Sequence, residues 1–293
     1  MQFTETSDIV YMTMNGSDLL MDVYVPSGEG PWPVVVAFHE LDSDGKDARD
    51  MTPVLEAAAA EGMVVFAPSW MIWDPPPFPF SAEGFDGWKQ AASCAVAFAQ
   101  QNAADYGGDP TNTVVYGFSA GAGAGLLASL QPSTDPISGC EADVAPTGIT
   151  GAVLGDGEFF LHSENFDEAF QAAPEAMAAE VAALTESTSW PADLNAKFFL
   201  WVADSGTSPR SIDDANVPGW LGQRDPNGSI QGDLDRLGQL EDRTISFIDA
   251  GELLELRLSE AGIDVTLDSY PGGHTTTDKI PELIDYLTAA TSE

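Results

Sequence analysis

Basic residues are scarce in this chain of 293 residues, which has 10 lysines and arginines against 47 aspartates and glutamates. The formal net charge of −37 gives the surface a strong negative potential. Such a surface repels nucleic acid and anionic lipid, and we exclude both as partners. The acids are spread along the whole chain, which favours a surface kept hydrated in saline or extracellular surroundings over a surface that binds acidic clients.

Long hydrophobic runs are also missing. No stretch approaches the roughly 20 apolar residues needed to cross a bilayer, so an integral membrane protein is excluded. The first ten residues are polar and lack a signal-peptide pattern, and we expect any export signal to have been removed. Hydrophobic residues nevertheless make up 44% of the chain, which is ample for a buried core.

Cysteine is rare as well. Cys94 and Cys140 are the two cysteines of the chain, and neither lies in a spacing typical of metal ligands or of a thioredoxin-type motif. The sequence therefore predicts neither a zinc site nor redox catalysis.

Predicted strands and helices alternate along the chain, which is typical of an α/β fold with a mainly parallel sheet. Asn15-Gly16 between two extended segments predicts an N-terminal hairpin. Strands are expected at 8–14, 18–25, 33–38, 63–67, 113–116, 149–154, 197–203 and 263–269. Helices are expected at 53–61, 88–104, about 122–130, 167–186, 250–260 and 279–289, with Asp249 as the N-cap of the helix over 250–260. No repeat or linker divides the chain, so we expect one domain over residues 1–293.

The segment 205–248 departs from this alternation. It is rich in Gly, Asp, Pro and Ser, and it is long for a connection within a compact domain, so we interpret it as an inserted surface segment. Its polar side chains at Asp225, Asn227, Asp233 and Asp235 do not have the spacing of an EF-hand loop. A solvated acidic loop is the better interpretation, and we expect no bound metal.

A Gly-Phe-Ser-Ala-Gly sequence at 117–121 lies between a predicted strand and a predicted helix. In that setting Gly-x-Ser-x-Gly predicts a nucleophile elbow, a tight turn that lifts the Ser119 hydroxyl above the sheet. The following helix presents its positive end where an oxyanion would develop. Phosphate binding by Gly121, Gly123 and Gly125 is disfavoured, because that function needs a Gly-x-Gly-x-x-Gly turn.

A serine nucleophile needs a base, and the chain has three histidines. In proteins with this elbow the triad residues follow in the order Ser, acid, His. His39 precedes Ser119, and His162 leaves little room for an intervening acid. His274, in the glycine-rich loop after the last predicted strand, is therefore the predicted base.

The acid of the triad is expected at the end of a strand between Ser119 and His274. The apolar strand over 197–203 ends on Asp204, which is the predicted acid. Asp156, at the end of the preceding strand, is the alternative. Asp242 and Asp249 are further options.

With these residues the chain resembles the α/β-hydrolase superfamily from the first buried strand to the C-terminal helix. His-Glu-Leu at 39–41 is similar to the dienelactone-hydrolase-like branch, and Tyr-Gly-Gly-Asp-Pro at 106–110 is similar to bacterial carboxylesterases. The resemblance implies an oxyanion hole formed by the backbone amides of Leu41 and Ala120. Dienelactone hydrolases use a cysteine nucleophile, whereas this chain has Ser119, and the segment after Asp204 is longer than is usual in the family.

Bacterial relatives of this kind tend to carry one cysteine in the helix before the elbow strand and another after the elbow helix. Cys94 and Cys140 occupy those positions. We therefore predict a disulfide between them and, with it, a secreted or otherwise extracytoplasmic location.

The sequence thus predicts a serine carboxylesterase that needs no cofactor and acts on small-molecule esters. Short acyl or aryl esters are the expected substrates, because the segment 68–87 supplies aromatic side chains near the expected pocket. Two alternatives remain open. The same triad could hydrolyse amides or peptides, or the chain could be a catalytically silent binding module on a hydrolase scaffold.

Overall fold

The computed structural model describes residues 1–40, 45–47, 51–70, 82–157, 190–192, 194–204, 207–211, 244–272 and 279–292. Eight of its strands form one sheet. They are β1 (Phe3–Met14), β2 (Ser17–Pro26), β3 (Trp32–Phe38), β4 (Val64–Pro68), β5 (Gly108–Phe118), β6 (Gly151–Gly155), β7 (Lys197–Ala203) and β10 (Val265–Tyr270).

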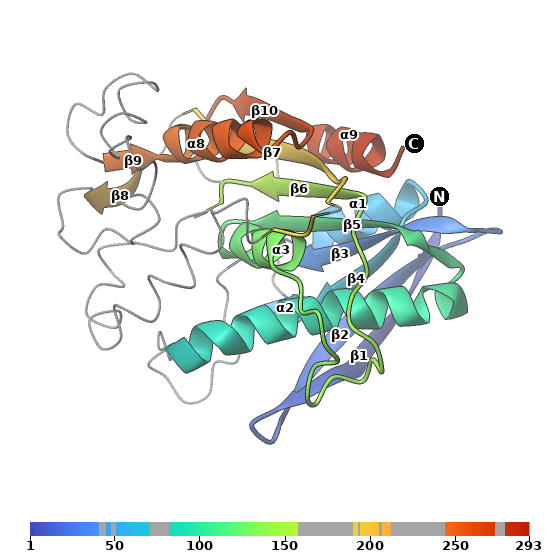
Figure 1. The fold of residues 1–293 in the computed structure, drawn as a ribbon. Coiled ribbons are helices and arrows are strands. Elements are labelled where there is room, and N and C mark those ends of the chain that lie inside the picture. Colours follow the sequence, from blue (N-terminus) through green and yellow to red (C-terminus); the bar gives the residue numbers. More distant parts are fainter. Residues whose placement is uncertain are drawn as a thin grey trace.

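The order of the strands in space is β1-β2-β4-β3-β5-β6-β7-β10 (Figure 1). The β1–β2 and β2–β4 pairs are antiparallel, and every other pair in this sheet is parallel. The predicted α/β class, with a mainly parallel sheet and an N-terminal antiparallel hairpin, is confirmed.

Helices cover both faces of the sheet (Figure 1). Helices α2 (Ala82–Asn102), α3 (Ala120–Leu130) and α8 (Phe247–Glu260) pack on one face, and α1 (Thr52–Ala60) and α9 (Ile280–Thr291) pack on the other. The short 3₁₀ turns η1 (Gly45–Asp47) and η2 (Ala103–Tyr106) lie in connections. Alternate residues of β3 contribute to the two cores, since Val34 and Val36 face the α2 side while Val35 faces the α1 side.

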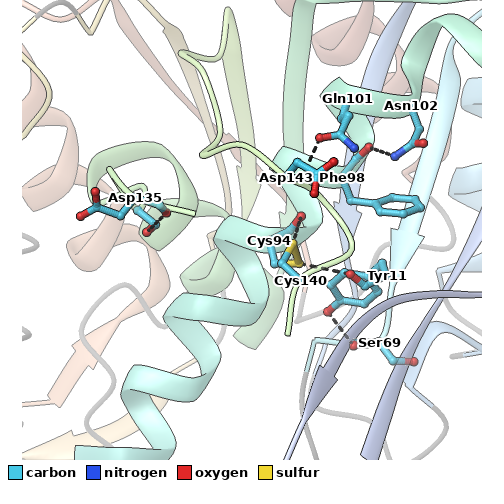
Figure 2. Close-up of a disulfide and its surroundings, with 10 residues drawn as sticks. Tyr11, Ser69, Cys94, Phe98, Gln101, Asn102, Asp135, Cys140 and Asp143 are labelled. Atoms are coloured by element: carbon cyan, nitrogen blue, oxygen red, sulfur yellow. Dashed lines mark hydrogen bonds between the residues drawn. A yellow bond between two sulfur atoms is a disulfide. The ribbon is translucent and has the colours of Figure 1, made fainter. Parts of the chain in front are cut away.

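The predicted disulfide between Cys94 and Cys140 is present, with a distance of 5.7 Å between the two Cα atoms (Figure 2). It joins α2 to the connection that follows α3. The same connection pairs with β1, because the Thr13 amide donates to the Gly139 carbonyl at 2.7 Å and the Glu141 amide donates to the Tyr11 carbonyl at 2.9 Å. The edge strand is thereby covered along part of its length, which protects it from pairing with other chains.

Two expectations about where helices begin were wrong. Helix α2 begins at Ala82 rather than at residue 88, and it continues through Gly87, where a Cβ would lie 3.3 Å from the Met14 sulfur. The absence of a side chain there lets α2 approach β1. Helix α8 begins at Phe247, directly after β9 (Thr244–Ser246), so Asp249 lies inside the helix and is not its N-cap.

The segment 205–248 contributes a second, two-stranded sheet that the sequence did not predict. Strand β8 (Thr207–Ser211) pairs antiparallel with β9, so the two ends of the segment lie together. Its remaining residues, with the acids at 225–235, and the helix expected at 167–186 lie outside the described residues.

The C-terminal end of the chain lies at the amino ends of the parallel strands, and the N-terminal end lies at the same side of the sheet (Figure 1). The Asn112 side-chain amide, near the start of β5, donates to the Thr291 carbonyl at the end of α9 at 2.9 Å. Ser119, Ala120 and Asp204 stand at the opposite, carboxyl edge. None of the helices in the described ranges is long and apolar enough to cross a membrane.

Candidate active site

Ser119 occupies the turn between β5 and α3. It follows Phe118, the last residue of β5, and it is the N-cap residue of α3. Its backbone has φ 56° and ψ −125°, which strains any residue that has a side chain. The turn is held because the Ser119 amide donates to the Gly155 carbonyl at 2.9 Å and the Ala122 amide donates to the Ser119 carbonyl at 3.0 Å. The half-buried Ser119 thus stands at the carboxyl edge of the sheet, in the predicted strand-turn-helix setting.

The glycines around Ser119 are required by close backbone contacts. A Cβ at Gly117 would lie 2.1 Å from the Gly121 carbonyl oxygen, and one at Gly121 would lie 2.1 Å from the Phe38 carbonyl oxygen. Both distances are far below van der Waals contact, so no larger residue fits at either position. The elbow can therefore pack directly against the end of β3.

The amino end of α3 gives the region beside Ser119 a positive partial charge. Ala120 is the first residue of the helix, and the amides of a first helical turn lack partners within the helix. No acidic side chain lies in this first turn, although the chain as a whole is strongly acidic. The Ala120 amide is therefore placed beside the serine where it can act as a donor to an anionic oxygen.

The end of β3 lies beside the elbow and leads into the segment that contains Leu41. His39 is 1% exposed, and its carbonyl accepts a hydrogen bond from Trp70 Nε1 at 2.9 Å. The rings of His39 and Trp70 also pack, with 5.6 Å between their centroids. Glu40 is the last described residue of this segment, and Leu41, the other predicted oxyanion residue, lies outside the described residues.

Asp204 directly follows β7 and is exposed. Its amide donates to the Tyr270 carbonyl at 2.9 Å, and its Oδ1 accepts from the Gly272 amide at 3.1 Å. Gly272 stands two residues before His274. The structure thus brings the predicted acid to the start of the loop that carries the predicted base, while His274 itself, like His162, lies outside the described residues.

Asp156 directly follows β6 and is completely buried, at 0% exposure. Its backbone is in a left-handed conformation, with φ 41°. One carboxylate oxygen accepts from the Ala203 amide at 2.6 Å, and the other accepts from the Tyr270 hydroxyl. The Tyr270 ring stacks on Trp201 with 4.0 Å between centroids. The alternative acid of the sequence analysis is therefore part of a buried network that links three strand ends.

Tyr116 lies on β5 three residues before the serine, and its hydroxyl is buried. Burial raises the pKa of this hydroxyl, and the negative charges of Glu40 and Asp156 raise it further. Tyr116 therefore stays protonated under all ordinary conditions.

Metal binding has no support in the described part of the chain, which contains no group of three or more His, Cys, Asp or Glu side chains able to hold an ion. The described residues place a serine hydroxyl beside helix amides.

The strand order, the antiparallel β2 and the strained serine between β5 and α3 define an α/β-hydrolase fold. The BD-FAE family model matches residues 21–149, a range that includes Ser119 and ends before Asp204 and His274. No curated protein matches the chain.

Solved structures of an esterase have the same fold. The native structure of thermophilic esterase 2 from the planctomycete Thermogutta terrifontis is 16% identical with a TM-score of 0.64, covering 96% of this chain and 91% of that chain. The same enzyme phosphoramylated by tabun is 15% identical with a TM-score of 0.64, covering 97% of this chain and 92% of that chain. Its propionate-bound form is 16% identical with a TM-score of 0.61, covering 96% and 92%. These similarities show that the chain has the α/β-hydrolase fold.

Proposed function

We propose that this protein is a serine hydrolase that cleaves carboxylic esters through an acyl-enzyme intermediate. The observation that carries the proposal is the strained, half-buried Ser119 at the amino end of α3. Strain of this kind persists at functional sites, where the surrounding structure holds a reactive side chain in place. The similar thermophilic esterase is found phosphoramylated by tabun and phosphonylated by sarin, which supports a serine mechanism in the fold.

In the proposed mechanism Ser119 Oγ attacks the ester carbonyl carbon while His274 takes the hydroxyl proton. The oxyanion of the tetrahedral intermediate accepts hydrogen bonds from the amides of Leu41 and Ala120. His274 then protonates the leaving alkoxide, which leaves an acyl group on Ser119. Water, activated by His274, releases the acid by the same steps in reverse. No cofactor is required.

Asp204 is proposed to orient His274 and to stabilise its protonated form. The hydrogen bond from the Gly272 amide supports this assignment, because it holds the Asp204 carboxylate at the start of the base loop. The two oxygens of Asp156 already accept hydrogen bonds from Ala203 and Tyr270. Asp204 keeps more of its acceptor capacity for the imidazole.

Short acyl esters are the proposed substrates. Structures of the similar esterase exist with propionate and with butyrate bound, which supports a small acyl pocket in this fold. Trp70 is the aromatic side chain of the segment 68–87 that the structure shows packed beside the elbow, where it is buried against His39. The proposal that aryl esters are also substrates therefore depends on aromatic side chains outside the described residues.

An extracytoplasmic location is proposed together with this activity. The Cys94–Cys140 disulfide supports it, because such bonds form and persist in oxidising compartments. The net charge of −37 is consistent with saline surroundings.

Matched nitrophenyl esters and nitroanilides with acetyl and butyryl groups test the proposed reaction class. We expect the purified protein to turn over both esters and to hydrolyse the anilides far more slowly. Comparable rates on the anilides would indicate an amide hydrolase, and no turnover of any ester or anilide would indicate a silent binding module.

A further inference from the structure

We propose that Asp156 is a positioning residue, which holds the segments of the triad acid and base in register through the Ala203 amide and the Tyr270 hydroxyl. The inference rests on the proposed function and extends it to a residue that does not touch the substrate. It depends on residues that the structure describes at the ends of β6, β7 and β10.

The first observation is the burial of the Asp156 carboxylate between two strand ends. Asp156 is 0% exposed, and its Oδ1 accepts from the Ala203 amide at 2.6 Å. Ala203 immediately precedes Asp204, the proposed acid. Leaving a buried acceptor without its donor costs free energy, so this hydrogen bond fixes the end of β7 and thereby the position of Asp204.

The second observation is the bond from the Tyr270 hydroxyl to Asp156 Oδ2, which reaches across β7 from β10. Tyr270 is four residues before His274, and its ring is held by stacking on Trp201. Its carbonyl accepts from the Asp204 amide at 2.9 Å. Tyr270 is thus tied to Asp156 by its side chain and to Asp204 by its main chain.

The third observation connects Asp156 to the elbow. The Ser119 amide donates to the Gly155 carbonyl at 2.9 Å, and Gly155 is the residue before Asp156. The left-handed conformation of Asp156, with φ 41°, turns the chain so that its side chain enters the core directly after this bond. Strain at a residue that has a Cβ persists only where the surroundings determine it.

These bonds give Asp156 one role toward three segments. One hydrogen bond joins Ser119 to Gly155, the residue before Asp156. Two more join the Asp156 carboxylate to Ala203, the residue before Asp204, and to Tyr270, which lies just before the His274 loop. A misplacement of about 1 Å between reacting groups is enough to lower a rate by about 100-fold. Loss of the Asp156 contacts should therefore lower kcat through Asp204 and His274, while substrate binding is left almost unchanged.

The test compares three variants with a matched control on nitrophenyl butyrate. Tyr270→Phe removes the hydroxyl and keeps the ring that stacks on Trp201. Asp156→Asn keeps an oxygen for the Ala203 amide but loses the carboxylate that accepts from Tyr270. The double variant combines both changes. Tyr286→Phe is the control, because it removes another tyrosine–aspartate bond to β10, from Tyr286 to Asp268 at 2.6 Å, on the exposed side.

We expect Tyr270→Phe and Asp156→Asn each to lower kcat by about 10-fold to 100-fold with little change in KM. The double variant should be no slower than the slower single variant, because both changes alter the same contact between Asp156 and Tyr270. In Tyr270→Phe, which changes no charge, the acidic limb of the kcat/KM profile should move to lower pH as His274 loses its orienting partner. Tyr286→Phe should match the wild type in all these measurements.

Three results would overturn the proposal. One is a kcat for Tyr270→Phe equal to that of Tyr286→Phe. Another is an effect of the same variants on KM alone. The third is a loss of about 10⁴ in Asp156→Asn with Asp204→Asn still active, which would make Asp156 the orienting acid itself. If Asp156→Asn fails to fold, Tyr270→Phe decides. A wild type without ester turnover would refute the proposed function, and this proposal with it.

Discussion

Two buried aspartates organise two regions of the sheet in different ways. Asp22 on β2 is 2% exposed, and its Oδ2 lies 3.0 Å from the ammonium of Lys46. Asp156 after β6 is 0% exposed and accepts from an amide and a phenol. The charge of Asp22 is offset by a cation, and Asp156 is bound by donors from the ends of the two strands that lead to the proposed acid and the proposed base. The region around Asp22 therefore contributes to stability, and the region around Asp156 shapes the proposed site.

Lys46 is the centre of the first region. It is 6% exposed, and its Nζ also lies 3.1 Å from Asp8 and 2.9 Å from Asp47. Burial alone would lower the pKa of Lys46, but hydrogen bonds to Asp47, Asp22 and Asp8 outweigh it and raise the pKa. For Asp22, burial raises the pKa more than the Asp8 amide and Lys46 lower it. Asp22 thus depends on Lys46 to remain charged, and loss of Lys46 should destabilise this group of side chains.

The largest effect on kcat is expected from replacing Ser119, the proposed nucleophile. Ser119→Ala should lower kcat by about 10⁶, because removal of the nucleophile of a triad disables the whole unit. The melting temperature should stay close to that of the wild type, since only a hydroxyl is lost. Steady-state kinetics on nitrophenyl butyrate and thermal unfolding check both expectations. Residual activity above a few per cent of the wild-type rate would contradict the mechanism.

The next largest effect separates the two acids of the site. Asp204→Asn should lower kcat by about 10⁴, since the imidazole of His274 would be held in the wrong tautomer. Asp156→Asn should have a far smaller effect. The ranking of kcat in the two variants, both shown to be folded by circular dichroism, is the measurement. The opposite ranking would assign the triad to Ser119, Asp156 and His274.

Replacement of both Cys94 and Cys140 by Ala tests stability away from the site. The bond closes a loop of 46 residues, and its loss should reduce the free energy of unfolding by about 4 kcal/mol in the chain-entropy model. Denaturant unfolding measures the loss, and kcat well below the melting temperature should not change. Two free thiols titrated in the unreduced, denatured wild type would refute the bond.

Lys46→Met tests the contribution of the buried ion pair between Asp22 and Lys46 to stability. Removing one partner of a buried ion pair costs about 3 kcal/mol, because Asp22 is left buried without its cation. Lys197→Met is the control, since among the described residues the Lys197 ammonium reaches the exposed Ser292 carbonyl, and it should change stability by less than about 0.5 kcal/mol. Chemical unfolding gives both values, and kcat should be unaffected in both variants.

The pH dependence of Lys46→Met has a definite sign. The folded-state pKa of Asp22 is already raised, so without Lys46 the carboxyl should take up a proton as the pH falls. The stability gap between Lys46→Met and the wild type should therefore narrow from pH 8 to pH 5. In the wild type the contribution of Lys46 is fully present below its ordinary pKa of about 10.4 and is lost as the pH rises through its higher folded value. A gap that is constant or widens toward pH 5 would contradict this account of Asp22.

The elbow could be predicted from sequence because its causes are local. Five residues specify the strained turn, and the contacts of Gly117 and Gly121 explain why glycine stands at both ends. The disulfide followed from the resemblance of two positions to related esterases, and the position of Asp204 followed from the end of an apolar strand. Local pattern was sufficient for the elbow and for the position of Asp204, whereas the disulfide required the resemblance.

The two buried aspartate networks could not be predicted, because their partners are distant in sequence. Tyr270 is 114 residues from Asp156, and Lys46 is 24 residues from Asp22. Glycines on both sides of Asp156 are a signal for its unusual backbone, but nothing in the sequence indicates which donors its carboxylate meets. The helix start at Ala82 was missed because Gly84 and Gly87 lower the helix propensity of the first two turns.

The central claim is that Ser119 is the nucleophile of an ester hydrolase, and covalent labelling tests it most directly. The folded wild type should react with a fluorophosphonate at a single serine, identified as Ser119 by peptide mass spectrometry, with ester turnover lost in proportion to labelling. Ser119→Ala should remain unlabelled. Labelling at another residue, or full ester turnover in the completely labelled protein, would contradict the account.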